Sequence, residues 1–476
     1  MSELDLNLLI DFYELTMANA YLSSEYKDTI AYFDMFYRKN PNNGGYVVLA
    51  GLEPLIKYLQ NLKFSEEDIA FLKSKNLFST EFLDYLKNFR FTCSIYSMPE
   101  GTIVFPNEPL LIVKGPIIQC QLIETMILLT INHQSLIATK AHRISYSAKG
   151  RKVIEMGSRR AQGYSAALYG ARSAYIGGID FTACTLADKA FNVPSTGTMA
   201  HSFVQLFDTE YEAFKFWAEV YPDNCSLLID TYDVIHSGII NAIKVFDEVL
   251  KPLGKFPVSI RIDSGDITYL SKICRKKLDE AGYTMCKIVV SNSLDEYIIE
   301  NILAEGAKID CFGVGENLIT SKQSPILGGV YKLVAIEKDK KCIPKIKISE
   351  NTEKITTPGV KKLYRFYDKN TNKALADLLT LETEKPSENQ YELFNPTYPW
   401  KRKLISSYYL KELLTPIFID GKLVYNLPSL SEIRTHCVNE TNSFWNEILR
   451  IDNPHIYYVD LSYDLWSLKQ NLIYKK

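Results

Sequence analysis

The sequence lacks the features by which a chain is exported or inserted into a membrane. No apolar run in its 476 residues is long enough to cross a bilayer, and the best candidate, Ile117–Ile131, is short and contains Gln119, Gln121 and Glu124. A signal peptide needs positive charge near the N-terminus, where this chain instead has Glu3, Asp5, Asp11 and Glu14. We therefore expect no membrane partner, and we expect an amphipathic helix over Leu4–Leu22.

Cysteine usage and overall charge exclude further classes of protein. The nine cysteines include no Cys-x-x-Cys pair, which predicts reduced thiols in a cytoplasmic protein and argues against a structural zinc site. The formal net charge of −2 gives no reason to expect nucleic acid as a partner. Aromatic residues are plentiful instead, with 31 tyrosines and 23 phenylalanines, most of which we expect in the core or in interfaces.

A repeated alternation of strand and helix is the main architectural pattern. A chain of this length predicts two or three domains. In its middle part, short β-rich runs alternate with segments of helical spacing such as Gly238–Leu250 and Thr268–Ala281. The runs predicted as strands are Lys152–Met156, Leu227–Asp230, Val258–Asp263, Lys287–Ser291 and Ile309–Val314. The last four recur at the length of one βαβ unit, which favours a parallel sheet covered on both faces.

An open doubly wound sheet and a closed barrel both fit this pattern, and the polar residues favour the barrel. Barrel enzymes build their sites from residues at the C-terminal ends of successive strands. Such residues here are Asp230 and Asp233, Arg261, Asp263 and Asp266, Ser291 and Asn292, and Gly313 and Gly315.

The flanks of this region follow another pattern. The N-terminal part mixes predicted helices and strands, among them Glu53–Leu62 and Ile30–Tyr37. After about Val330 we predict strands with charged faces at Tyr331–Glu337, Pro344–Ser349 and Leu363–Asp368, and the tail from Ser429 returns to helix. We therefore predict an α/β barrel over residues 131–335, enclosed by flanking segments 1–130 and 336–476.

Two polar clusters in the predicted barrel give the best indication of function. Gly157–Gly163 reads Gly-Ser-Arg-Arg-Ala-Gln-Gly, and Gly197–Ser202 reads Gly-Thr-Met-Ala-His-Ser; each follows a short apolar segment. A guanidinium binds a carboxylate or phosphate through two parallel hydrogen bonds, so we expect Arg159 or Arg160 to hold an anion. The alternative is a pair of surface arginines in salt bridges, which the flanking glycines and the strand-end position disfavour.

Histidine is scarce, with six in the chain, and the context of His201 favours it over the others as a functional residue. A turn at Gly197-Thr198 would aim backbone amides at an anion, and Ser202 places a hydroxyl beside the ring. The alternative is a packed structural histidine, the commoner role for a single histidine in a chain of this size. His236 is a weaker candidate, and we interpret the others as structural: His133, His142, His436 and His455.

A glycine-containing strand ends the barrel pattern. The run Phe312–Asn317 contains Gly313 and Gly315, where the backbone can approach a phosphate closely, as in the phosphate site common in barrels. The third glycine of a dinucleotide-binding fingerprint is missing, and the run is not a Walker loop. By itself the pair of glycines is weak evidence.

In combination, motifs spread over the chain resemble those of the nicotinate phosphoribosyltransferase family. They extend from about residue 6 to 472 and include Ile10–Met17, Phe36–Pro41, Gly157–Gln162, Gly197–Ser202, Ile260–Asp266, Phe312–Gly315, Leu427–Arg434 and Asn453–His455. The resemblance implies a type II phosphoribosyltransferase fold: an α/β fold in which an irregular, incomplete α/β barrel is flanked by an α/β sandwich built from the N- and C-terminal segments. It also implies a homodimer with active sites shared between subunits.

The resemblance further implies a reaction. Nicotinate and 5-phosphoribosyl pyrophosphate would give nicotinate mononucleotide and pyrophosphate, in the salvage of NAD, with Mg²⁺ and with ATP hydrolysis coupled through a phosphorylated histidine at His201. Three alternatives stay open. A nicotinamide-specific relative would need a carboxylate to accept the amide. A quinolinate enzyme is usually shorter, needs extra cations for its second carboxylate and uses no ATP. A non-catalytic dimeric scaffold would share the fold alone.

Residue roles follow by matching the motifs of that family. Tyr13 would stack on the pyridine ring from the neighbouring subunit, and nicotinate would contact Arg159, Thr198, Ser202 and Arg261. Asp263 would bind the ribose hydroxyls, Gly313 and Gly315 the 5′-phosphate, and Arg38 the pyrophosphate across the dimer. The resemblance names no Mg²⁺ ligands. Ser158 and Ile179–Phe181 lie in stretches that commonly differ in the family, which leaves the role of Asp180 open. Glu316 is an acid near the phosphate site, and it would either turn outward or help to hold Mg²⁺.

Overall fold

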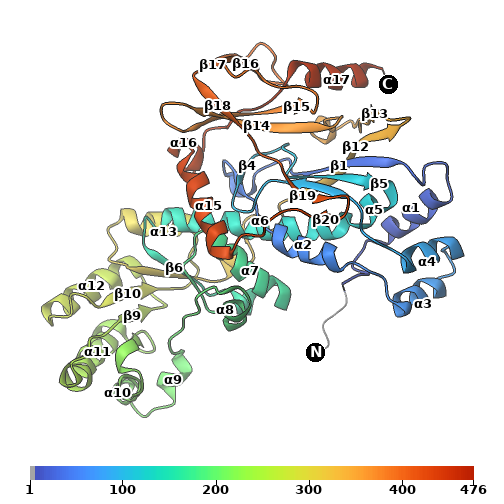
Figure 1. The fold of residues 1–476 in the computed structure, drawn as a ribbon. Coiled ribbons are helices and arrows are strands. Elements are labelled where there is room, and N and C mark those ends of the chain that lie inside the picture. Colours follow the sequence, from blue (N-terminus) through green and yellow to red (C-terminus); the bar gives the residue numbers. More distant parts are fainter. Residues whose placement is uncertain (1–5, 476) are drawn as a thin grey trace. The chain divides into compact units, whose positions relative to one another are not determined.

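The computed structural model describes residues 6–475, which divide into two compact units (Figure 1). Unit 1 is discontinuous: it contains the chain up to Leu136 and again from Ile326 onward. Unit 2 is the continuous segment Ile137–Pro325 between those two parts. The long helix α6 (Glu124–Ser147) begins in unit 1 and ends in unit 2.

Unit 2 is built on a sheet of six parallel strands in the order β7-β6-β11-β10-β9-β8. Its strands are β6 (Lys152–Glu155), β7 (Phe181–Thr182), β8 (Ser226–Leu228), β9 (Ser259–Ile262), β10 (Lys287–Val290) and β11 (Cys311–Val314). The five strands predicted here and their parallel arrangement are confirmed, whereas β7, only two residues long, was missed. Strands β7 and β8 lie at the two edges, and in the described part of the chain no pairing joins them into a closed barrel.

Helices follow the strands of unit 2, and Figure 1 shows α11 and α12 lying beside β9 and β10. The helices are α7 (Tyr164–Ile176), α8 (Thr185–Phe191), α9 (His201–Gln205), α10 (Glu210–Val220), α11 (Ile239–Val245), α12 (Ile267–Glu280), α13 (Glu296–Ala304) and α14 (Glu316–Ile319). Short π-helical turns, Val234–Gly238 and Phe246–Leu250, extend α11 on both sides. The apolar faces of these helices and strands form one buried core, with Leu227, Ile260, Ile288 and Phe312 at its centre.

Two aspartates expected at the strand ends begin helices instead. Asp266 accepts a hydrogen bond from the backbone N–H of Tyr269 at 2.8 Å and caps α12. Asp233 accepts bonds from the N–H groups of Ile235 and His236 at 2.9 and 2.8 Å and caps the first π-helical turn. A carboxylate satisfies free N–H groups at a helix start and favours the positive end of the helix dipole. These two residues therefore have a local structural role.

Unit 1 contains a seven-stranded antiparallel sheet in the order β13-β12-β1-β5-β3-β19-β20. Its strands are β1 (Ile30–Phe36), β3 (Ser94–Ser97), β5 (Leu111–Pro116), β12 (Val330–Lys338), β13 (Lys341–Pro344), β19 (Thr415–Ile419) and β20 (Lys422–Leu423). A second sheet of β14 (Lys361–Asp368), β15 (Ala374–Leu381), β18 (Tyr408–Glu412) and β21 (Val459–Leu461) packs against it (Figure 1). Between the sheets, Asp34 of β1 and Lys361 of β14 form a buried ion pair at 2.9 Å.

The remaining elements of unit 1 are helices and short ladders. The helices are α1 (Phe12–Leu22), α2 (Leu52–Asn61), α3 (Glu66–Ser74), α4 (Thr80–Lys87), α5 (Ile117–Leu122), α15 (Leu430–Asn442), α16 (Asn446–Leu449) and α17 (Tyr463–Tyr474). The ladders pair β2 (Val47–Val48) with β4 (Ile103–Val104), and β16 (Gln390–Phe394) with β17 (Arg402–Ser406). Throughout residues 6–475, each helix is too short or too polar to span a bilayer.

Two predicted elements of unit 1 need correction. The first helix begins at Phe12 rather than Leu4, because Asp11 is extended and donates its N–H to the Thr125 hydroxyl at 3.1 Å; Leu4 and Asp5 lie outside the described residues. The strand predicted over Pro344–Ser349 ends at Pro344, where β13 stops, and its charged residues continue as an irregular segment. Proline cannot donate to a strand ladder, which fits its place at the end of that strand.

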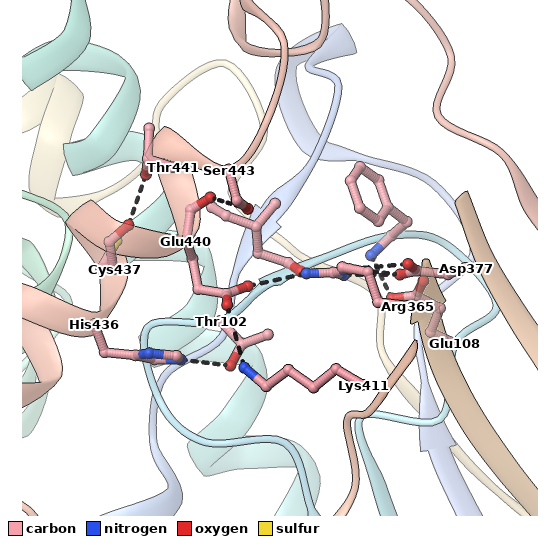
Figure 2. A network of polar contacts seen from close by, with 12 residues as sticks. Thr102, Glu108, Arg365, Asp377, Lys411, His436, Cys437, Glu440, Thr441 and Ser443 are labelled. Atoms are coloured by element: carbon pink, nitrogen blue, oxygen red, sulfur yellow. Dashed lines mark hydrogen bonds and ion pairs between the residues drawn. The ribbon is translucent and has the colours of Figure 1, made fainter. Parts of the chain in front are cut away.

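A buried arginine joins the two halves of unit 1 (Figure 2). Arg365 of β14 donates to the carboxylate of Asp377 at 2.7 and 2.8 Å, to Glu440 at 2.9 Å and to the backbone carbonyl of Ile103 at 2.8 Å. None of these three side chains is appreciably exposed. Glu108 lies in the same network, and burial followed by the charge of Asp377 raises its pKa well above the usual range. The N-terminal residues Ile103 and Glu108 are thus held to the C-terminal segment.

A buried carboxyl in α1 should make the stability of unit 1 depend on pH. Glu14 is fully buried, and its Oε1 accepts bonds from Thr125 N–H and Oγ1–H at 3.1 and 2.6 Å, while Oε2 has no partner. Burial raises the pKa of Glu14 to about 8. The folded state then holds this proton from pH 4.5 to about 8 while the unfolded state loses it, so stability falls as pH rises through that window.

Glu14→Gln should remove that dependence, because an amide mimics the neutral acid. We expect the variant to gain stability over the natural protein at pH 8, on the order of 1 kcal/mol, and to match it near pH 5. Melting temperatures measured from pH 5 to 8 check this, with the exposed Glu81→Gln of α4 as the control. Parallel pH profiles for the natural protein and Glu14→Gln would contradict the assignment.

Candidate active site

A single large cavity lies against one face of the parallel sheet in unit 2. Its volume is about 1180 Å³. Each of the six strands contributes one or two residues to the cavity lining. Where a strand contributes two, they are two positions apart. The lining residues of the strands are Lys152 and Ile154, Phe181, Ser226, Ser259 and Arg261, Lys287 and Val289, and Cys311 and Gly313. Alternate residues of a strand share one face, so the cavity follows that face across the whole sheet. Arg159, Thr198, His201 and Asp263 line it near the C-terminal ends of the strands.

Two guanidinium groups create a positive region in this cavity. Arg159 lies in a short 3₁₀ turn (Ser158–Arg160) directly after β6, is exposed, and has no carboxylate partner in residues 6–475. Arg261 of β9 donates from Nη1 to Thr198 Oγ1 at 2.7 Å, and its buried Nε has no partner. Burial lowers the pKa of Arg261, Asp263 and Asp230 raise it, and the charge of Arg159 lowers it again. An anion placed between the two guanidiniums would offset both the desolvation of Arg261 and its repulsion from Arg159.

His201 stands beside this positive region, at the first residue of α9. Its Nδ1 is 3.1 Å from the Thr231 hydroxyl, and its Nε2 is 3.8 Å from Oδ2 of Asp263. The imidazole is about two-fifths exposed and lines the cavity. The hydrogen bond with the Thr231 hydroxyl orients the ring, and the Asp263 carboxylate faces its other nitrogen beyond hydrogen-bond distance.

Asp230, predicted among the polar residues at the strand ends, supports Asp263. Asp230 is buried and follows β8; its Oδ2 accepts bonds from Asp263 N–H at 2.8 Å and from Ser264 Oγ–H at 2.7 Å. The Ser291 hydroxyl donates to Oδ1 of the Asp263 carboxylate. Asp230 Oδ1 is buried and has no partner in the described chain. Residues at the ends of three strands, β8, β9 and β10, therefore form one polar network.

The glycines after β11 lie where predicted, but one of them is required by packing. A Cβ at Gly313 would be 2.6 Å from Met156 Sδ and 3.2 Å from Ser291 Cβ, so a side chain there would displace both neighbours. Gly315 has ordinary space around it. Asn317, missed in the sequence, donates from Nδ2 to the carbonyls of Ser293 and Leu294 at 2.9 and 3.1 Å. It holds the loop after β10 against the loop after β11, and both loops line the cavity.

Several predicted or undecided residues are placed elsewhere by the structure. Ser202 is exposed in α9 and is not part of the cavity lining. His236 is exposed as well, with Nδ1 3.1 Å from Asp233. Glu316 lines the cavity, but Lys322 at 2.7 Å pairs with its carboxylate and lowers its pKa. Asp180 pairs with Lys152 at 2.9 Å and accepts the N–H of Val153 at 3.0 Å, so it fixes the start of β6.

Tyr13 and Arg38 belong to unit 1, and their assignments stay predictions. The Tyr13 side chain is 45% exposed although it lies in α1; burial of the phenol, followed by the charge of Glu124, raises its pKa. Arg38 donates from Nε to the carbonyl of Glu353 at 3.0 Å, and its guanidinium lies 5.5 Å from the centre of the Phe36 ring. Tyr13 is thus exposed and Arg38 half-buried, so the aromatic ring is the group that a ligand or a second subunit would more readily cover.

Comparisons with known proteins cover nearly the whole chain. Three family models match it: the nicotinate phosphoribosyltransferase N-terminal domain at residues 8–132, the nicotinate phosphoribosyltransferase family at 151–381, and the nicotinate phosphoribosyltransferase C-terminal domain at 360–469. A nicotinate phosphoribosyltransferase of Bacillus subtilis is 43% identical over 471 residues, which cover 99% of this chain and 96% of that protein. The chain is a member of the nicotinate phosphoribosyltransferase family.

Other members of the nicotinate phosphoribosyltransferase family agree with this assignment. The nicotinate phosphoribosyltransferase of Caenorhabditis elegans is 37% identical over 530 residues, covering 98% of this chain and 93% of that protein. The crystal structure of human nicotinic acid phosphoribosyltransferase superposes with a TM-score of 0.84 at 28% identity, covering 98% of this chain and 100% of that one. The resemblance predicted from the sequence motifs is thus confirmed, and the mixed α/β architecture is that of the human structure.

Proposed function

We propose that this protein joins nicotinate to 5-phosphoribosyl pyrophosphate, giving nicotinate mononucleotide and pyrophosphate for the salvage of NAD. The observation that carries the proposal is the pair Arg159 and Arg261 in a cavity that is also lined by Asp263, Gly313 and Gly315. The guanidiniums suit the carboxylate of nicotinate, and Asp263 with the two glycines suits a phosphorylated ribose. Membership in the nicotinate phosphoribosyltransferase family supports the same substrates.

The glycosyl step breaks the bond from ribose C1 to the pyrophosphate oxygen and forms a bond from C1 to the pyridine nitrogen. Its transition state is oxocarbenium-like, so it needs orientation and negative charge near the sugar rather than a protein nucleophile. Asp263, fixed by Ser291 and by its backbone bond to Asp230, would bind the ribose hydroxyls. Arg159 and Arg261, with Thr198 bonded to Arg261, would hold the nicotinate carboxylate, whereas Ser202 lies outside the cavity lining.

ATP would act through His201, which would accept its γ-phosphoryl group and lose a proton as ADP leaves, and water would later release phosphate. Mg²⁺ would neutralise phosphate charge when bound. Mg²⁺ commonly uses one or two protein carboxylates together with substrate phosphates. The buried, unpaired Oδ1 of Asp230 and the carboxylate of Asp263 fit that requirement, while no group of three potential protein ligands occurs in residues 6–475.

The remaining proposals concern the assembly. A homodimer with shared sites would bring Tyr13 of one subunit to the pyridine ring and Arg38 to the pyrophosphate of the other; the exposure of Tyr13 in unit 1 supports this. The six-stranded sheet would form the incomplete barrel of residues 131–335, since one cavity contacts the same face of all six strands. Segments 1–130 and 336–476 would form the sandwich. A cytoplasmic location stays a prediction from cysteine usage.

A direct assay tests the function. Purified protein is incubated with nicotinate, 5-phosphoribosyl pyrophosphate and Mg²⁺, with and without ATP, and mononucleotide formation is followed. We expect turnover with nicotinate, stimulation by ATP, and little turnover with nicotinamide or quinolinate. A non-catalytic scaffold would neither consume the phosphoribosyl donor nor gain melting temperature from it, and that result would overturn the proposal.

Arg159→Ala should selectively weaken the binding of nicotinate. A hydrogen bond to a charged group contributes about 1.5–3 kcal/mol, so we expect the KM for nicotinate to rise roughly 10- to 100-fold and the KM for the phosphoribosyl donor to change much less. Arg159→Lys keeps the charge but not the two parallel hydrogen bonds, so its KM for nicotinate should lie between those of the natural protein and Arg159→Ala. Steady-state kinetics with each substrate varied checks this. Equal increases in both KM values would argue against a carboxylate clamp.

A further inference from the structure

A buried glutamate lies behind the positive region of the cavity. Glu155 is the last residue of β6, between β7 and β11 in the sheet, and its side chain is fully buried. It does not line the cavity, which begins with its neighbours Ile154 and Met156. A carboxyl group in such a place is costly unless donors reach both of its oxygens.

Each carboxyl oxygen of Glu155 has one donor, and the two donors come from different segments. Oε1 accepts the backbone N–H of Gly157, the residue that begins the turn containing Arg159. Oε2 accepts the hydroxyl of Thr182 in β7 at 2.6 Å. Burial raises the pKa of Glu155, and the bonds from Thr182 and Gly157 lower it, so both bonds favour the ionised carboxylate.

Thr182 carries the connection onward to the second polar cluster. It is fully buried; its N–H donates to the carbonyl of Pro194 at 3.0 Å and its carbonyl accepts the N–H of Thr196 at 2.9 Å. Its hydroxyl also accepts the N–H of Cys184 at 2.9 Å. Thr196 is two residues before Thr198, which accepts the hydrogen bond of Arg261.

Little space exists for the Arg159 turn to shift toward this carboxylate. A Cβ at Gly157 would be 2.5 Å from Ile319 Cβ and 2.9 Å from Oε1 of Glu155, so the backbone is packed closely against both. Gly157 also accepts the N–H of Arg160 at 2.7 Å, which closes the turn. The position of the Arg159 backbone therefore depends on where Glu155 holds Gly157.

We infer that Glu155 is a positioning residue that fixes the turn of Arg159 relative to the segment of Thr198, and thereby sets the geometry of the nicotinate carboxylate site. The inference rests on the proposed function for the identity of the ligand, but the clamp itself is a property of the ligand-free protein. A carboxylate is required because it accepts from both sides. A glutamine has one acceptor oxygen, so either Gly157 N–H or the Thr182 hydroxyl would lose its acceptor.

The kinetic test changes the two ends of the hydrogen bond between Glu155 and Thr182, each to a side chain of similar size. Glu155→Gln and Thr182→Val should each raise the KM for nicotinate about 10- to 100-fold, with a much smaller change in the KM for the phosphoribosyl donor. Thr182→Ser keeps the hydroxyl and should restore nicotinate binding. Thr185→Val, an exposed threonine at the start of α8, is the matched surface control.

Hydrogen exchange of the ligand-free variants supplies a second readout that does not depend on activity. Faster exchange should be confined to the amides of Gly157, Cys184 and Thr196, and Thr182→Ser should resemble the natural protein. Exchange that rises throughout unit 2, or equal increases in both KM values, would show a general structural role and overturn the inference. Localised exchange in a protein with no nicotinate turnover would instead uphold the clamp and refute the proposed function.

Discussion

A His201→Ala variant is expected to form no phosphoenzyme and to lose all stimulation by ATP, while still forming mononucleotide slowly. His201 lines the cavity with its ring bonded to the Thr231 hydroxyl and 3.8 Å from the carboxylate of Asp263. Alanine removes the only histidine of the cavity lining, and with it the nitrogen that would accept the phosphoryl group. The glycosyl step needs no protein nucleophile, so basal transfer persists. Labelling with ATP radioactive at the γ-phosphate, together with rates measured with and without ATP, checks both parts.

The matched control is His236→Ala. His236 is exposed and pairs with Asp233 outside the cavity lining, so its loss should leave phosphoenzyme and ATP stimulation unchanged. Full coupling to ATP in His201→Ala would refute the assignment of the phosphorylated residue. Loss of the basal transfer as well would show that the imidazole takes part in the glycosyl step.

Replacing Arg365 with alanine should lower the free energy of unfolding by about 3–5 kcal/mol, the range expected when one partner of a buried ion pair is removed. The guanidinium makes bonds to Asp377, Glu440 and the carbonyl of Ile103; alanine leaves the buried carboxylate of Asp377 without its counter-charge and leaves Glu440 with Lys411 at 3.7 Å. The rings of Phe105 and Phe444 also lose the cation at 5.7 and 4.9 Å from their centres. Denaturant unfolding followed by circular dichroism measures the change.

Arg402→Ala provides the contrast within the same unit. Arg402 pairs with Glu392 on the surface at 2.6 Å, with both side chains about half exposed. A pair of that kind contributes little, so we expect a change within about 0.5 kcal/mol. Similar losses for Arg365→Ala and Arg402→Ala would mean that the buried network does not hold unit 1 together.

The strands of unit 2 were predictable because they are near-continuous apolar runs. Runs of this length are typical of strands in a parallel sheet that is covered on both faces. Strand β7 was not predicted because its two residues, Phe181 and Thr182, are too few to form a pattern. Which polar residue enters the cavity was less predictable. Asp230, Asp233, Asp263 and Asp266 look alike in the sequence, yet the structure uses two as helix caps and two in the polar network.

The network residues were not predictable because their partners are far apart in the chain. Asp230 bonds to the backbone of Asp263 more than thirty residues away, and Asn317 reaches back to Ser293. Periodicity records which face of an element is buried, and it carries no information about such pairings. The roles of Tyr13 and Arg38 rest on the motif resemblance alone, because no pattern within one chain indicates what a second subunit would contact.

The discontinuity of unit 1 has a consequence for biosynthesis. Strand β1 pairs on one side with β5, but its partner on the other side is β12, which begins at Val330, about 300 residues after β1 ends at Phe36. Strand β3 likewise pairs with β19, which is synthesised much later. At about 5–20 residues per second, a ribosome needs tens of seconds to supply these strands. During that interval the emerging chain presents two open sheet edges, each a template for pairing with a neighbouring nascent chain.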